Sequence, residues 1–264
     1  MPSSSTLRVA GLDVVYYRAG DGPPLVLVHG AAGDAREWRP QMAGLSDDFT
    51  VIAWDEPGAG RSSDVPAGLG LAGYATALGA LIDAVGAPAH VCGLSWGGTV
   101  ALELYRRRPQ AVATLVLADT YAGWKGSLPE AEVRTRVRSV ERMLAGAAQT
   151  GRPSLPGLFA GEPPADAAEL LTAIAADVRR ESVRVALAAM AEADLRDVLP
   201  HIAVPTLLIW GERDARSPLT VARQFASAIP DAELVLIPAA GHMSNLECPE
   251  AFNAAMRAFY ARLR

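Results

Sequence analysis

The sequence predicts an α/β fold, in which a mostly parallel sheet is covered by helices on both faces. Short apolar runs alternate with segments of helical period along residues 1–119 and again after residue 200. Continuous apolar runs are typical of strands buried on both faces of a parallel sheet. Between residues 120 and 199 this alternation stops, and helical spacing alone remains.

The predicted strands follow from the length and composition of the apolar runs. Residues 12–18 are predicted as a strand, and residues 25–28, Leu-Val-Leu-Val, form the first continuous apolar run. The further strands are predicted at residues 50–54, 90–94, 114–117, 206–210 and 234–237. Strands that alternate with helices predict a mostly parallel sheet.

Two amphipathic helices accompany these strands. One is ended by Gly86-Ala87-Pro88 and has one apolar face, formed by Leu71, Tyr74, Leu78, Leu81, Ile82 and Val85. The last helix of the chain has an apolar face formed by Phe252, Met256, Phe259, Tyr260 and Leu263. Both sets recur at three- and four-residue intervals, as expected for one face of a helix.

Residues 120–199 predict a helical insertion. Apolar residues with helical spacing occur there in three groups, which begin at Val133, Leu170 and Val183. A segment of roughly 80 residues is too long to be a bare loop in a compact domain. It follows a strand, at the carboxyl edge where α/β folds bind their ligands. We therefore expect residues 1–119 and 200–264 to form the core, and residues 120–199 to form a cap over the functional site.

Composition narrows the function classes. The 264 residues are 50% hydrophobic and 20% charged, with a net charge of −5 and no basic tract, so neither nucleic acid nor a membrane is an expected partner. The first residues do not show the charged segment followed by an apolar segment that marks a secretory signal. The apolar runs of the chain are too short to cross a bilayer. We expect a cytoplasmic protein without a metal site, in which Cys92 and Cys248 are not bonded to each other. The sequence does not decide between a monomer and a homodimer.

The most informative motif surrounds Ser95. Residues 93–97 read Gly-Leu-Ser-Trp-Gly, after an apolar strand and before a helix-forming run. A tight strand-to-helix turn of this kind exposes the serine hydroxyl above the edge of the sheet. Gly93 and Gly97 have no Cβ, so the strand and the helix can approach each other closely. Ser95 is the candidate nucleophile.

A serine nucleophile needs a neutral imidazole to accept its proton, and an acid to orient that imidazole. His242 lies in a loop just after the buried strand 234–237, which brings it to the same sheet edge as Ser95. Asp214 follows the strand 206–210 in the same way and is the preferred acid. Asp119, which ends the strand 114–117, is the competing acid.

The developing oxyanion also needs donors. We expect the backbone N–H of Trp96, next to the serine, and that of Ala31 in the small-residue loop 29–33, with Ala32 as the alternative. Trp96, Tyr121, Trp124 and Met243 are the candidates for substrate contact. Cationic residues of the insertion that could bind a substrate carboxylate are Lys125, Arg134, Arg138 and Arg152.

Taken together, these motifs resemble the α/β-hydrolase fold over nearly the whole chain. They are His29-Gly30, residues 55–62 (Asp-Glu-Pro-Gly-Ala-Gly-Arg-Ser), residues 93–98, residues 211–214 and Gly241-His242. Residues 92–95 and 115–120 are most similar to the 3-oxoadipate enol-lactonase group of lactonases and esterases. The resemblance implies an eight-stranded sheet, a helical cap after the sixth strand and no cofactor. Residues 55–62 are a loop signature of the family, in which Glu56 is a candidate for the pocket rim.

The expected activity is hydrolysis of a small ester or lactone, through an acyl-enzyme on Ser95. Three alternatives remain open. The same three side chains serve hydrolysis of a C–C bond in a β-diketone-like substrate, and cofactor-free perhydrolysis. The fold also serves ligand receptors that turn over slowly or not at all. Fold alone does not decide among them.

Overall fold

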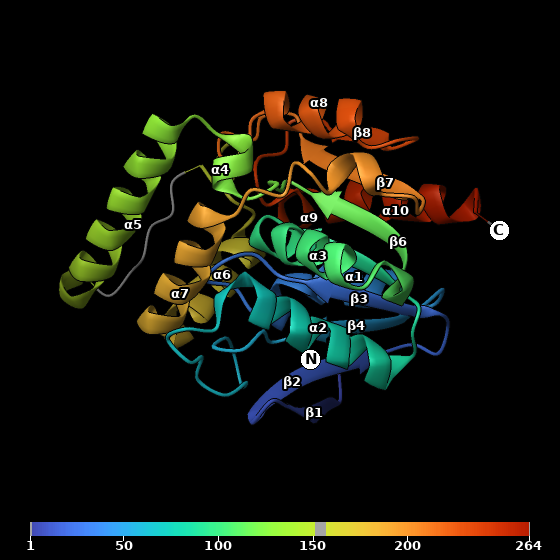
Figure 1. The fold of residues 1–264 in the computed structure, drawn as a ribbon, viewed down its shortest axis with the longest axis horizontal. Coiled ribbons are helices and arrows are strands. Elements are labelled where there is room, and N and C mark those ends of the chain that lie inside the picture. Colours follow the sequence, from blue (N-terminus) through green and yellow to red (C-terminus); the bar gives the residue numbers. More distant parts are fainter. Residues whose placement is uncertain (1, 151–156, 264) are drawn as a thin grey trace.

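A computed structural model describes residues 2–150 and 157–263, and a twisted sheet runs through its centre (Figure 1). The strands are β1 (Ser4–Val9), β2 (Leu12–Ala19), β3 (Pro24–Val28), β4 (Thr50–Trp54), β5 (Ala89–Leu94), β6 (Val112–Ala118), β7 (Thr206–Gly211) and β8 (Glu233–Ile237). In the described residues they form one eight-stranded sheet, in the order β1-β2-β4-β3-β5-β6-β7-β8. β2 pairs antiparallel with β1 and β4, and the pairs from β4 to β8 are parallel. The predicted mostly parallel sheet is confirmed.

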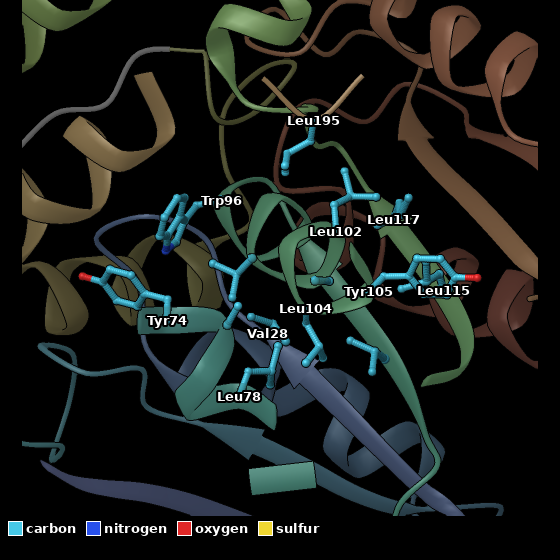
Figure 2. Close-up of a cluster of buried hydrophobic side chains, with 14 of the residues drawn as sticks. Val28, Tyr74, Leu78, Trp96, Leu102, Leu104, Tyr105, Leu115, Leu117 and Leu195 are labelled. Carbon is cyan, nitrogen blue, oxygen red and sulfur yellow. The ribbon is translucent and has the colours of Figure 1, made fainter. Parts of the chain in front are cut away.

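Helices cover both faces of this sheet. The helices of the core are α1 (Arg39–Leu45), α2 (Gly70–Val85), α3 (Trp96–Arg107), α8 (Leu219–Ala228), α9 (Ser244–Glu247) and α10 (Pro249–Ala261), and η1 (Ala35–Trp38) is a 3₁₀ turn before α1. Side chains alternate along β3: Val26 and Val28 join the apolar cluster under α2, α3 and α8, and Leu25 and Leu27 join the cluster under α1 and α10. Figure 2 shows part of the first cluster. Alternation of this kind is required of a strand buried on both faces.

The segment between β6 and β7 is helical in its described part. It contains α4 (Trp124–Ser127), α5 (Glu130–Thr150), α6 (Ala165–Asp177) and α7 (Arg180–Glu192). In Figure 1 these helices lie together beyond one end of the sheet, and α5 is the farthest from it. The three predicted helical groups fall on α5, α6 and α7. The division of the chain into two domains at residues 119 and 200 stays a prediction.

The structure differs from the expected elements at both ends of the chain. β1 has no apolar run, because it is an edge strand and most of its residues are exposed; the apolar pattern therefore could not indicate it. Leu263 lies beyond the end of α10 and is 45% exposed, so it does not belong to the buried face of that helix. Cys92 and Cys248 are free thiols. Among the described residues, we find no helix with the length and apolar character needed to cross a membrane.

Candidate active site

Ser95 occupies a strained turn between β5 and α3. Its backbone has φ 53° and ψ −115°, outside the regions that side-chain-bearing residues favour. Such a conformation costs on the order of 1–3 kcal/mol and persists only when its surroundings impose it. Here the Ser95 N–H donates to the Ala118 carbonyl over 2.9 Å, and the Ser95 carbonyl accepts the Gly98 N–H over 3.1 Å. The hydroxyl of Thr120 also donates to the Ser95 carbonyl.

The glycines on either side of Ser95 make this turn possible. A Cβ on Gly93 would lie 2.5 Å from the Gly97 backbone, and one on Gly97 would overlap the carbonyl oxygen of Val28. The strand β5, the neighbouring strand β3 and the first turn of α3 are therefore packed backbone against backbone. That packing holds the serine at the carboxyl end of the parallel strands.

The predicted nucleophile, base and acid lie in one chain of hydrogen bonds. The Ser95 Oγ lies 2.9 Å from Nε2 of His242, and Nδ1 of His242 lies 2.9 Å from Oδ2 of Asp214. A carboxylate can only accept, so Nδ1 donates to Asp214, and Nε2 is left to accept the serine proton. All three side chains are at least nine-tenths buried.

Asp214, not Asp119, contacts the histidine. The second oxygen of Asp214 accepts the backbone N–H groups of Arg216 and Ser217 over 2.8 and 2.9 Å, which fixes the carboxylate. Asp119 instead accepts the Gly211 N–H over 2.7 Å and the Ser244 hydroxyl over 2.5 Å. Burial, reinforced by the nearby charge of Asp214, raises the pKa of Asp119 well above its usual range.

The loop that carries His242 is bonded both to the core and to the insertion. The Arg213 N–H donates to the Ala240 carbonyl over 2.8 Å, on the core side. On the side of the insertion, the Met243 N–H donates to the Leu158 carbonyl over 2.8 Å. The carboxylate of Glu247 accepts N–H groups from both parts, at Gly241 and Ala160, over 2.6 and 3.0 Å.

A cavity of about 700 Å³ opens above Ser95 and His242. Gly30, Ala31 and Ala32 line it beside the serine, as expected of the loop that supplies an oxyanion donor. Of the substrate contacts predicted from the sequence, the cavity wall includes Tyr121, Trp124 and Met243. Its wall in the helical insertion is largely apolar and includes Met143, Leu144, Leu171, Leu187 and Met190.

Comparison with known proteins agrees with this fold and site. The model of the alpha/beta hydrolase family matches residues 25–255. This chain belongs to the alpha/beta hydrolase family. The predicted family and eight-stranded fold are thereby confirmed, and so is the identification of the chain as a hydrolase-type enzyme.

Three individual proteins illustrate the breadth of this hydrolase family. The chain is 33% identical, over 98% of its length and 69% of the relative's, to the dihydrolipoyllysine-residue acetyltransferase component of the acetoin cleaving system of Pseudomonas putida. A thermophilic esterase from Thermogutta terrifontis is similar in structure, with a TM-score of 0.86, 31% identity and coverage of 97% of this chain and 96% of that one. The enol-lactonase of Burkholderia xenovorans has a TM-score of 0.80, 26% identity and coverage of 97% and 100%.

The side chain of Trp96 does not form a cavity wall in this hydrolase, which corrects the expectation from the sequence. Trp96 begins α3, and its ring packs edge-on against Tyr74 of α2, with centroids 5.2 Å apart (Figure 2). Its Nε1–H donates to the buried carboxyl of Glu56 over 2.7 Å. Trp96 is absent from the described residues that line the cavity. Helix packing directs the ring into the core, so only the backbone N–H of Trp96 stays a candidate for the site.

Two aromatic residues of the cavity wall are held by one arginine. The Arg136 guanidinium lies 5.5 Å from the ring centre of Tyr121 and 5.6 Å from that of Trp124. It also donates to the Tyr121 hydroxyl over 2.8 Å and to the carbonyl of Arg216 over 2.7 Å. Burial raises the pKa of Tyr121 to about 12, so this hydroxyl stays protonated at neutral pH.

The charged residues of the cavity wall are not those expected from the sequence. Lys125, Arg134 and Arg138 are exposed and absent from the described cavity wall, and Arg152 lies outside the described residues. The wall instead includes Arg180, Arg216 and Glu37. The position of Arg216, two residues after the acid Asp214, was a signal that could have found it.

Glu37 belongs to a buried group of titratable side chains beside the serine. It is 4% exposed, and so is Glu56. Both lie near His29, whose Nδ1–H donates to the Gly30 carbonyl over 2.8 Å, and whose Nε2 accepts the Glu56 N–H over 3.2 Å. Burial raises the pKa of Glu37 and of Glu56 to about 7 each. Glu56 is thus a partner of Trp96 in the core, rather than part of the described wall of the main cavity.

The contact of Gly97 with Val28 generates a stability prediction. Gly97→Ala places a Cβ on a backbone oxygen that cannot move without shifting β3, and overpacking of this kind costs about 1–3 kcal/mol or more in the free energy of unfolding. Urea unfolding measures the loss. Gly68→Ala is the matched control, because a Cβ there meets no atom within 4 Å. Equal stability of the two variants would contradict the prediction.

Proposed function

We propose that this protein is a serine hydrolase that cleaves a small ester or lactone through an acyl-enzyme on Ser95. The observation that carries the proposal is the hydrogen-bonded chain from Ser95 through His242 to Asp214, at the floor of the cavity. The names of two structural relatives, an esterase and an enol-lactonase, support the same class of bond.

In the first half of the reaction, Ser95 attacks the substrate carbonyl carbon while Nε2 of His242 takes the hydroxyl proton. The carbonyl oxygen becomes an oxyanion and accepts the N–H groups of Ala31 and Trp96. His242 then gives the proton to the leaving alkoxide, which departs as an alcohol, or stays attached if the substrate is a lactone. Asp214 accepts Nδ1–H throughout and stabilises the imidazolium that forms.

In the second half, His242 takes a proton from water, and the hydroxide attacks the acyl-enzyme. Collapse of this second tetrahedral intermediate returns the proton to Ser95 and releases the acid. Each proton that His242 takes is returned, so the enzyme emerges unchanged. The largely apolar wall of the insertion favours a small-molecule substrate with an apolar acyl group, because a charge set against these side chains would lose its hydration.

The first prediction from the proposed function concerns the nucleophile. A fluorophosphonate is expected to label Ser95, and Ser95→Ala is expected to lower kcat for a p-nitrophenyl ester by about 10⁴- to 10⁶-fold, as triad deletions do elsewhere. Mass spectrometry of the adduct and steady-state kinetics measure both. Product in excess of one equivalent per protein also separates an enzyme from a receptor of the same fold. Labelling of another serine in active protein would refute the assignment.

The second prediction compares the two acids. Asp214→Asn is expected to lower kcat by about 10⁴-fold, because an amide favours the wrong imidazole tautomer. Asp119→Asn is expected to cost far less, since Asp119 contacts Gly211 and Ser244 rather than His242. The two variants keep the size of their parents, and kcat is compared once urea unfolding shows that both are folded under the assay conditions. The reverse order of effects would assign the orienting role to Asp119.

The third prediction concerns the acyl group. Trp124→Ala enlarges the cavity wall, and is expected to change the ratio of kcat/KM for long and short p-nitrophenyl esters by about tenfold, since apolar pockets discriminate by roughly 1–3 kcal/mol per methylene. The neighbouring Lys125→Ala is the control, because that exposed side chain is absent from the described wall. If Trp124→Ala lowers kcat/KM for every ester equally, the indole only packs the insertion.

A further inference from the structure

We propose that Glu37 is a positioning residue for the oxyanion loop, residues 29–33, and that its carboxyl holds this loop in the shape that presents the Ala31 N–H to the reacting oxygen. The inference rests on the proposed function, because it assigns a role within the same reaction. Its basis is the arrangement of backbone atoms around the Glu37 carboxyl.

The oxyanion loop is folded around this carboxyl. The Gly30 N–H donates to Oε2 of Glu37 over 3.1 Å. The Gly33 N–H donates back to the Gly30 carbonyl over 3.1 Å, which closes the loop into a turn, and Ala32 within it has a φ of 64°. A Cβ on Gly33 would overlap the carboxyl, so the glycine makes room for it. One side chain therefore fills the inside of the turn that carries Ala31.

The backbone of Glu37 is itself fixed by hydrogen bonds. Its N–H donates to the Asp34 carbonyl over 3.0 Å, within the η1 turn. Its carbonyl accepts the side-chain amide of Asn245 over 3.0 Å, and the Asn245 carbonyl accepts the side-chain amide of Gln41 over 3.0 Å. Asn245 lies in α9, just after His242. The turn that contains Glu37 is therefore hydrogen-bonded to α9, the short helix that follows the catalytic histidine.

The carboxyl is also close to the place where charge develops. A Cβ built on Gly30 would lie 3.7 Å from Oε2 of Glu37 and 3.8 Å from the Cβ of Ser95, so the two side chains flank the same glycine. Glu37 also lines the cavity. An ionised Glu37 would place a negative charge beside the oxyanion, whereas a protonated Glu37 would not.

The sign of the pH effect follows from this geometry. Burial raises the pKa of Glu37 to about 7, against the lowering effects of His29 and the Gly30 N–H. Below pH 7 the carboxyl is neutral, and above pH 7 its charge opposes the oxyanion and slows acylation. The other charged groups on the segments around η1 are Asp34, Arg36, Arg39, Asp55, Glu56, Asp166, Glu169, Asp177 and Glu247. Arg36 is paired with Asp34 and Asp177, and Asp55 and Glu247 accept backbone N–H groups.

The test uses three variants of the whole chain, assayed with one p-nitrophenyl ester. Glu37→Gln keeps an acceptor for the Gly30 N–H and removes the charge. Glu37→Met keeps the approximate size and removes the acceptor. Glu56→Gln is the matched control, because Glu56 has the same burial and a similarly raised pKa, but its carboxyl accepts the Trp96 Nε1–H instead of an N–H of the loop. The rate of fluorophosphonate labelling at Ser95 is followed in each.

We expect the ratio of kcat for Glu37→Gln to kcat for the wild type to rise at least about threefold between pH 6 and pH 9. Over this range only the wild type gains a negative charge at position 37. Contributions to the pH profile that do not depend on position 37 cancel in this ratio. Glu37→Met is expected to lower kcat by roughly 10- to 100-fold with KM unchanged, less than the loss of a whole oxyanion donor.

A ratio for Glu37→Gln that stays flat with pH would overturn the inference, as would an equal rise for Glu56→Gln. These two ratios need only the Gln variants, which we expect to fold because Gln has nearly the same size and shape as Glu. If Glu37→Met does not fold, the test therefore still stands. Failure of the proposed function is distinguishable, because wild-type protein would then show no labelling at Ser95 at any pH.

Discussion

The strained turn at Ser95 is the constraint on which the other parts of the site depend. A serine at φ 53° is held there only because β5, β3 and α3 touch through glycine backbone, and because Ala118 and Thr120 of the next strand's end bond the same residue. Once the serine is placed, the base must come from a segment that reaches it across the ends of β6 and β7. His242 does so from the loop after the edge strand β8.

The sheet order explains why two acids meet at this site. β6 lies between the strand that carries the serine and the strand that carries Asp214, so its last residues are inside the site. Asp119, at that end, binds the Gly211 N–H of β7 and the Ser244 hydroxyl after His242. It thus joins the segment of the acid to the segment of the base. A buried carboxyl in this position needs neighbours that donate to it, and its burial together with the charge of Asp214 raises its pKa.

Much of the site could be predicted because its residues follow recognisable apolar strands. Ser95, Asp214 and His242 each come directly after such a run, and parallel strands end at one edge, so their proximity followed from order and period alone. The direction of Trp96 could not be predicted in this way. Its ring turns toward Tyr74 and Glu56 because α2 and the loop after β4 pack there, and both contacts are distant in sequence.

Glu37 and Arg216 were not predicted as cavity residues either, because their surroundings also come from segments distant in sequence. Glu37 belongs to no motif, Arg216 is marked only by its closeness to Asp214, and a single charged residue is usually a solvated one. Glu37 is buried because the oxyanion loop folds around it, and Arg216 is half-buried because the helical insertion packs against its segment. The edge strand β1 was missed because an exposed strand has no need of an apolar pattern.

The contacts of residues 158–160 with the histidine loop bear on how such enzymes can be recombined. Leu158 and Ala160 belong to the insertion, yet they bond Met243 and Glu247 beside His242. Exchange of the insertion with that of another family member therefore also exchanges two backbone partners of this loop. A chimera that joins the new insertion after residue 160 keeps them, whereas one that replaces residues 120–199 as a block inherits whatever the donor supplies at these positions.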